Sequence, residues 1–163
     1  MGTLTQSQIT ALLMQRDPLP ALVPQGVWRE ELASVIAGLS APPLVKAGLH
    51  LLNDDIDRCH RIAQAHEMAD GNYWHAILHR RETDYGNAKY WYRRVGEHAI
   101  FSDLRATWPE WEPLAFVDWC QDVARGTNGK SREWLEGVQA RELERLLEFV
   151  NAGYPTSKGA VHG

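Results

Sequence analysis

The sequence has only two cysteines and no long apolar run, and these shortages exclude several classes of protein. Cys59 and Cys120 are too few for the disulfide framework of a small secreted domain, and they lack the CxxC spacing of redox and zinc motifs. No uninterrupted apolar stretch approaches the roughly 18 residues that a membrane-spanning helix needs. The start of the chain has no basic segment followed by a long apolar one, so no signal peptide is expected. These features predict a cytoplasmic protein with two reduced thiols.

A strong charge of either sign is also missing. The formal net charge is -4 and the pI is about 6.0, so no global field would attract nucleic acid or an anionic membrane. We therefore expect neither as a partner. The chain also lacks a glycine-rich phosphate loop and a GxSxG nucleophile motif. The partner expected instead, from the polar segment described below, is a small polar or anionic molecule, with a protein segment as the alternative, and no feature indicates a particular oligomeric state.

Apolar residues recur at intervals of three and four along most of the chain, the period of amphipathic helices. No segment has the alternating pattern of a strand, so the predicted fold is all-α: a compact single-domain helical bundle over residues 1–163. Residues 1–25 are expected to form a peripheral helix and a proline-rich connector, and residues 153–163 a frayed tail. Asp70-Gly71 is expected to break the pattern, and a loop is expected from His98 to Trp111. Helices are expected over residues 28–39, 44–53, 55–66, 72–82, 84–96, from Pro113 and from Ser131.

A weak internal repeat is found when the chain is aligned with itself at an offset of 29 residues. LHLLNDDIDRCHRIAQ then matches LHRRETDYGNAKYWYR, which pairs Asp55 with Asp84 and Cys59 with Ala88. Each copy is a predicted helix, a turn that ends in an Asp suited to N-capping, and a second helix with a small residue at its crossing point. This layout is that of a tetratricopeptide-like helical hairpin, with a shorter period than usual. The repeat predicts two stacked αα-hairpins within the bundle.

The segment from Trp74 to His98 has an unusual concentration of polar and aromatic residues. It contains three of the seven histidines, four arginines and two of the seven tryptophans. Ionisable groups beside large aromatics are costly to bury unless they are paired or hydrogen-bonded. Such a mixture is typical of a pocket wall that grips a polar ligand.

Helical geometry arranges these residues in rows. At 100° per residue, His75, His79 and Glu82 share one stripe beside the apolar arc of their helix. The following helix has a second polar row, and the preceding helix a third. If the apolar arcs pack together, the three rows converge on one cleft. The second row consists of Asn87, Tyr90 and Arg94 beside Trp91, and the third of His60 and Gln64.

One interpretation of this cleft is a metal site. His75 and His79 are one helical turn apart, a spacing that zinc and iron sites use, and Glu82 could supply the third ligand. His60 or His98 could close the site from a neighbouring segment. A divalent metal with an open position would polarise water or a carbonyl group. The alternative is that the histidines are half-buried hydrogen-bond partners with no metal.

The second interpretation is capture of an anion. Arginine guanidinium groups suit carboxylates and phosphates, and Arg80, Arg81 and Arg94 are candidates. Arg81 points at the apolar arc, so its charge is expected to be balanced by Glu82, Asp84 or a ligand. Arg80 is expected on a polar face, in solvent. The alternative is an arginine–glutamate lattice that only braces two helices.

The block GNYWHAILHRRETDYGNAKYWYRRVGEH resembles a signature of small uncharacterised bacterial all-helical proteins. Their pattern is W-H-x3-H-R-R-E-x-D-x2-N-A-x-Y-W-x-R-R-V-G-x-H, preceded by a helix with Asp and His like residues 55–64. The resemblance covers about a third of the chain and brings no assigned activity. It implies a bacterial origin, an all-helical domain and a functional reason for these residues: His60, His75, His79, Arg80, Arg81, Glu82, Asn87, Tyr90, Trp91, Arg94 and His98.

The sequence thus predicts a small-molecule-binding helical protein, and leaves open whether it is an enzyme that uses acid/base or metal-assisted chemistry. In this hypothesis His75, His79 and Glu82 are the catalytic or metal-binding groups. A tetratricopeptide-like module for protein–protein interaction and a purely structural lattice are the alternatives. The residues expected to bind the ligand are His60, Gln64, Arg80, Arg81, Asn87, Tyr90, Trp91, Arg94 and His98.

Overall fold

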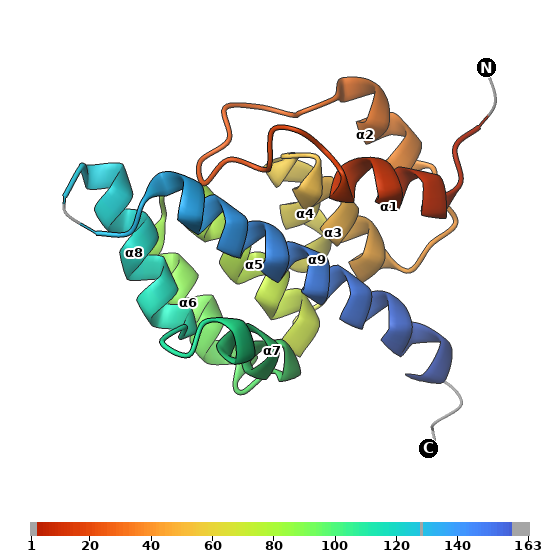
Figure 1. Cartoon of the computed structure of the whole chain (residues 1–163). Coiled ribbons are helices and arrows are strands. Elements are labelled where there is room, and N and C mark those ends of the chain that lie inside the picture. Colours follow the sequence, from red (N-terminus) through yellow and green to blue (C-terminus); the bar gives the residue numbers. More distant parts are fainter. Residues whose placement is uncertain (1–2, 128, 158–163) are drawn as a thin grey trace.

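The structure is a computed structural model that describes residues 3–127 and 129–157, and it confirms the all-α fold. Within these residues there are nine helices and no strand (Figure 1). The helices are α1 (Gln6–Met14), α2 (Glu30–Ala37), α3 (Pro43–Leu52), α4 (Ile56–Ala63), α5 (Ala69–Arg81), α6 (Tyr85–Val95), α7 (Ala99–Thr107), α8 (Pro113–Arg125) and α9 (Arg132–Ser157).

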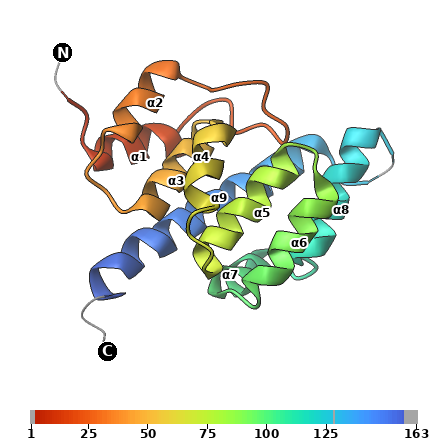
Figure 2. The ribbon, with the colours of Figure 1, turned by 180° about the vertical axis from the view of Figure 1, so that it is seen from behind.

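The helices α3 to α6 pack in sequence order, each against the next. Figure 2 shows α4, α5 and α6 on the near face, and the long helix α9 passes behind them. Helix α9 contacts α3, α7 and α8, while α1 and α2 both contact α3 and each other. The core between these layers is apolar and includes the fully buried side chains of Trp74 and Trp111.

The two predicted hairpins, α3–α4 and α5–α6, have the same turn between their helices. Asp54 and Thr83, 29 residues apart, both have left-handed backbone conformations, with φ of 61° and 64°. In each turn the residue after the left-handed one donates its N–H to a histidine carbonyl, Asp55 to His50 and Asp84 to His79, both at 2.9 Å. This is the hydrogen bond of a Schellman helix end. The shared turn supports the internal repeat; the likeness to tetratricopeptide proteins stays a prediction.

The small residues expected at the helix crossings are indeed buried. Cys59 and Ala88 are both 0% exposed. The thiol of Cys59 is surrounded by apolar groups, and this burial raises its pKa well above the ordinary value. Both positions are therefore packed, as the predicted hairpin arrangement requires.

The expected break at Asp70-Gly71 is wrong, because α5 already begins at Ala69. Glycine lowers helix propensity, but here it is needed for a close approach. A Cβ atom at Gly71 would overlap the carbonyl oxygen of His66. Only glycine, which has no side chain, lets the backbone at His66 lie this close to residue 71 of α5.

The loop expected from His98 to Trp111 is also wrong, since residues 99–107 form α7. The His98 side chain caps this helix: its Nδ1 accepts a hydrogen bond from the backbone N–H of Ile100 at 3.1 Å. Apolar residues at 100, 101 and 104 then face the core. Helix N-caps are usually Ser, Thr, Asp or Asn, and histidine is uncommon in this role. The start of α7 therefore has no familiar sequence signal.

The last helix begins as predicted and is longer than expected. The Ser131 hydroxyl accepts a hydrogen bond from the N–H of Trp134 at 3.1 Å. Helix α9 continues to Ser157, so residues 153–157 of the expected frayed tail are helical, while residues 158–163 lie outside the described residues. None of the described helices combines the length and apolar character needed to cross a bilayer.

Candidate functional site

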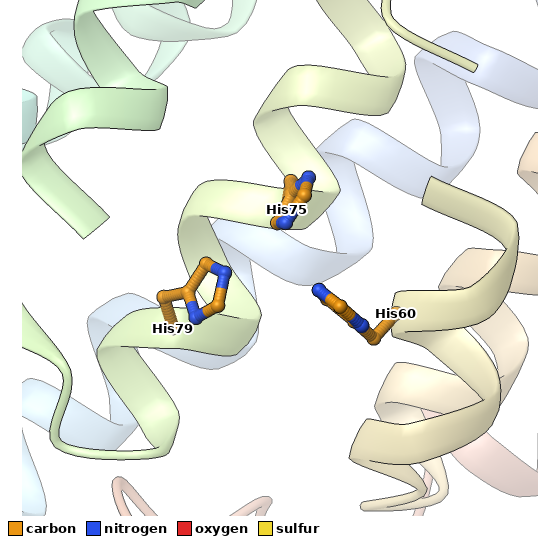
Figure 3. A group of neighbouring side chains, drawn as sticks. All are labelled: His60, His75 and His79. Atoms are coloured by element: carbon orange, nitrogen blue, oxygen red, sulfur yellow. The ribbon is translucent and has the colours of Figure 1, made fainter. Parts of the chain in front are cut away.

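Three histidines from two helices converge on the near face of the molecule. His60 comes from α4, and His75 and His79 lie one turn apart on α5 (Figure 3). Each ring offers one nitrogen, and these three nitrogens lie within 4.8 Å of one another. Among the described residues this is the one group of three or more His, Cys, Asp or Glu side chains with metal-ligand spacing.

The packing of α4 against α5 brings His60 to the other two. Cys59 and Ala63, which flank His60 on α4, are small and fully buried, so the two helices approach closely. The His60 ring then lies edge-on to both partners, with ring centroids 4.8 Å from His75 and 5.5 Å from His79. His60 is half-buried while His75 and His79 are buried, so the cluster has one open side.

His79 is held by hydrogen bonds on both ring nitrogens. Its Nδ1 lies 3.0 Å from Oε1 of Glu82, and its Nε2 lies 3.3 Å from the amide nitrogen of Asn87. An ionised carboxylate only accepts, so Nδ1 carries the proton and Nε2 keeps its lone pair. Glu82 was predicted as a third metal ligand; the structure places it behind His79, where it orients the ring, and places His60 in the third position.

His75 has no such polar support. Its ring stacks on Trp91 of α6, with a centroid distance of 3.9 Å and an interplanar angle of 13°. Its Nδ1 is buried and has no hydrogen-bond partner in the described part of the chain. A buried nitrogen with an unsatisfied lone pair or proton costs about 1–3 kcal/mol. The site therefore contains an unfilled polar contact beside an aromatic wall.

Burial keeps these imidazoles neutral. Desolvation, reinforced by the nearby rings of His79 and His60, lowers the pKa of His75 to about 4. Desolvation also lowers the pKa of His79, although Glu82 opposes this change. Both rings are consequently unprotonated at neutral pH, which is the state that metal ligation requires.

The remaining predicted contacts form a rim around the histidines. Gln64 and Tyr90 are exposed, and the Tyr90 ring stands edge-on to Trp91. Arg94 extends over the same indole, 5.3 Å from its centroid, and forms an ion pair with Glu67 at 3.2 Å. Of the three arginines predicted to bind an anion, Arg94 is the one that is exposed to solvent, and it lies beside Trp91.

Arg80 differs from its expected position. It was expected in solvent, but it is 1% exposed and points into the core. Its guanidinium group donates to Glu142 at 2.9 Å, to the Tyr92 hydroxyl at 2.7 Å and to Gln139 at 2.9 Å. The expectation failed because its carboxylate partner is 62 residues away in sequence. Arg80 thus joins α5 to α6 and α9.

Arg81 is buried and paired, but not with Glu82 or Asp84. Its partner is Asp54, at 2.6 Å, and it also donates to the backbone carbonyls of Leu51 and Ala21. The same aspartate accepts from Arg16 at 3.1 Å. All three nitrogens of Arg81 are therefore occupied by protein groups. His98 is likewise separate from the cluster: its Nε2 lies 2.7 Å from Asp70 while its Nδ1 caps α7.

Sequence reasoning did not find Glu142 and Gln139. Both are 0% exposed and lie on the apolar stripe of α9, between Leu135 and Leu146. Polar residues at core positions of an amphipathic helix are a signal of buried partners. Tyr73 and Tyr92 both donate to Glu142 at 2.8 Å, which completes the network around its carboxylate.

The geometry of the three histidines suits a divalent transition metal. Zinc–nitrogen bonds of about 2.05 Å and tetrahedral angles place neighbouring ligand nitrogens about 3.3 Å apart. The present spacing of up to 4.8 Å exceeds this by about 1.5 Å, so the three nitrogens would have to move closer together on metal binding. Three protein nitrogens leave a coordination position open towards the half-buried side.

Comparison with known proteins identified no relative of this chain: no protein-family model, no curated protein and no solved structure matched it.

Proposed function

We propose that this protein binds a divalent metal, zinc or iron(II), through His60, His75 and His79, and that the metal binds a small polar or anionic molecule. The observation that carries the proposal is the convergence of three imidazole nitrogens within 4.8 Å, from two helices. Two of these rings are buried and neutral, and one has an unsatisfied nitrogen. That nitrogen is available to a ligand, since no described protein group bonds it.

The neighbouring residues have supporting roles in this proposal. Glu82 accepts a hydrogen bond from the Nδ1–H of His79, which makes the opposite nitrogen, Nε2, a better metal ligand. Trp91 fixes the plane of the His75 ring by stacking. Arg94, which lies over Trp91 at the edge of the site, would neutralise a negative charge on the bound molecule.

The chemistry that follows is metal-assisted. Three protein ligands and an open position are the arrangement of catalytic zinc sites, in which the fourth position holds water or substrate. Such a metal lowers the pKa of bound water to about 7 and polarises a carbonyl oxygen. We therefore propose hydration or hydrolysis of a small polar substrate as the reaction class. Arg80 and Arg81 have no part in it, because protein groups occupy them.

The test is the metal content and zinc affinity of protein purified without chelator or an affinity metal. Elemental analysis should give one metal ion per chain, and calorimetric titration of the stripped protein should give one tight site. His60→Ala, His75→Ala and His79→Ala should each abolish the tight site. His66→Ala is the matched control, since its ring bonds only the Ile62 carbonyl one turn back on α4.

Circular dichroism distinguishes the proposal from a structural role. The three alanine variants should retain the helical spectrum while they lose metal. If the wild type binds no zinc or iron(II), and the variants lose helix, the cluster is a structural element and the proposed function is wrong.

A further inference from the structure

A surface cavity lies between α2, α3 and α4, on the first of the two hairpins. Its volume is about 270 Å³, and its lining contains three cationic side chains and no acidic one. The residues that line it are Ala37, Lys46, His50, Arg58, Arg61 and Ile62.

This cavity occupies the position in the first hairpin that the histidine site occupies in the second. At the offset of 29 residues, Lys46 and His50 of α3 correspond to His75 and His79 of α5. The other wall corresponds as well: Arg58, Arg61 and Ile62 match Asn87, Tyr90 and Trp91. In both copies a pair of residues at i and i+4 lies beside the helix that follows, although the histidine cluster also takes His60 from the preceding helix α4.

The cations around the first cavity are only partly used by the protein. Lys46 donates to two carbonyl oxygens at the end of α2, those of Ala37 at 2.7 Å and Leu39 at 3.1 Å, which leaves one N–H. Arg58 forms one ion pair, with Asp55 at 2.6 Å, and keeps further donors. Arg61 is exposed and has no hydrogen bond or ion pair with any described residue.

A buried histidine completes the wall. His50 is 2% exposed, and its Nδ1 has no hydrogen-bond partner in the described chain. The nearest carboxylate, Asp55, is 3.9 Å away and already bonded to Arg58. His50 thus adds a buried nitrogen without a described partner to a wall that already holds three cations.

We propose that this cavity binds a small oxyanion, a phosphate or a carboxylate group, between Lys46, Arg58 and Arg61, with His50 as an additional hydrogen-bonding group. The planar guanidinium groups suit two oxygens of such an anion, and the lysine adds a point charge. The site goes beyond the proposed metal function and does not depend on it, since the two share no residue.

The test is a titration of isotopically labelled full-length protein with inorganic phosphate, and separately with acetate, at constant ionic strength. The ring signals of His50 are followed by NMR. Saturable shifts with at least one of the two anions are expected. Arg61→Gln should weaken the affinity by about tenfold, the effect of losing one charge-assisted hydrogen bond. Lys46→Gln should weaken it similarly. Arg93→Gln, at an exposed arginine of α6, is the matched control and should leave the affinity unchanged.

Saturation by phosphate alone would identify a phosphate site, and saturation by acetate a carboxylate site; both support the proposal. The absence of saturable shifts with either anion would overturn it. Equal weakening in Arg61→Gln and Arg93→Gln would also overturn it, because the effect would then be general charge screening.

Discussion

The histidines and arginines between residues 75 and 81 share one helix but have opposite surroundings. The guanidinium groups of Arg80 and Arg81 face the core and bond to carboxylates and carbonyls of distant segments. The imidazoles of His75 and His79 face α4 and α6, where one nitrogen has no partner. Arg80 and Arg81 thus brace the fold, whereas in the proposed metal site His75 would use a nitrogen without a partner and His79 would exchange its weak contact with Asn87 for the metal.

Glu82 should tune the metal site without being a ligand. Replacing it with alanine removes the acceptor of the His79 Nδ1 proton, so zinc affinity should fall about 10- to 100-fold, as for other residues that orient a metal-binding histidine. Glu82→Gln should lose less, since its amide oxygen still accepts. Calorimetric titration measures this, with the exposed Glu133→Ala as control. Complete loss of binding in Glu82→Ala would instead identify the carboxylate as a ligand, as first predicted.

At the scale of elements, the start of α5 depends on one glycine. A Cβ at Gly71 would overlap the His66 carbonyl, so Gly71→Ala must displace the backbone and should lower the free energy of unfolding by 1–3 kcal/mol or more, on the order of other overpacking changes. Gly86→Ala on α6 is the control, because a Cβ there meets nothing within 4 Å. It should be neutral or stabilise by about 0.4–1 kcal/mol. Urea unfolding measures both, and equal effects would refute the close-approach argument.

The Arg80–Glu142 pair joins three helices, and breaking it should be costly. Arg80→Met leaves the Glu142 carboxylate buried with only two tyrosine hydroxyls, so the free energy of unfolding should fall by about 3–5 kcal/mol. Arg93→Met, at an exposed position of the next helix, should change it by less than about 0.5 kcal/mol. A small loss in Arg80→Met, measured by urea unfolding, would mean that the network contributes little.

The helices themselves were largely predictable because their apolar period is local. The first failure was at α5, where a glycine with poor helix propensity is required by a contact to His66. The second was at α7, whose cap is a histidine. In both places a specific tertiary or side-chain contact outweighed the propensity on which sequence reasoning depends.

At the scale of the whole molecule, the proximity of the three histidines could be predicted from the sequence, whereas the positions of Arg80 and Arg81 could not. His75 and His79 share a stripe by helical geometry, and His60 lies on the polar row of the neighbouring helix. The partners of Arg80 and Arg81 lie on α9 and at the end of α3, 62 and 27 residues away. No local pattern connects such positions, so these arginines were predicted as ligand-binding groups while they brace the fold.

The pH dependence of stability should contain a contribution from His50. Burial lowers its pKa to about 4 in the folded protein, against about 6.5 when unfolded. Between these values the unfolded chain binds the proton and the folded one does not, so stability should fall as the pH drops from 6.5 to 4. The full contribution is about 3 kcal/mol. Urea unfolding of metal-free protein at several pH values in this range measures the free energy of unfolding. This free energy should fall less steeply with decreasing pH in His50→Gln than in the wild type. Identical slopes would contradict the lowered pKa.

The most direct test of the metal site is X-ray absorption spectroscopy of the zinc-loaded protein. Three imidazole nitrogens at about 2.0–2.1 Å and at least one oxygen ligand are expected in the wild type, and the three-imidazole signal should be absent from His60→Ala, which has lost the tight site. A spectrum with two or fewer imidazoles in the wild type, or one that His60→Ala leaves unchanged, would contradict the central claim that His60, His75 and His79 together form a metal site.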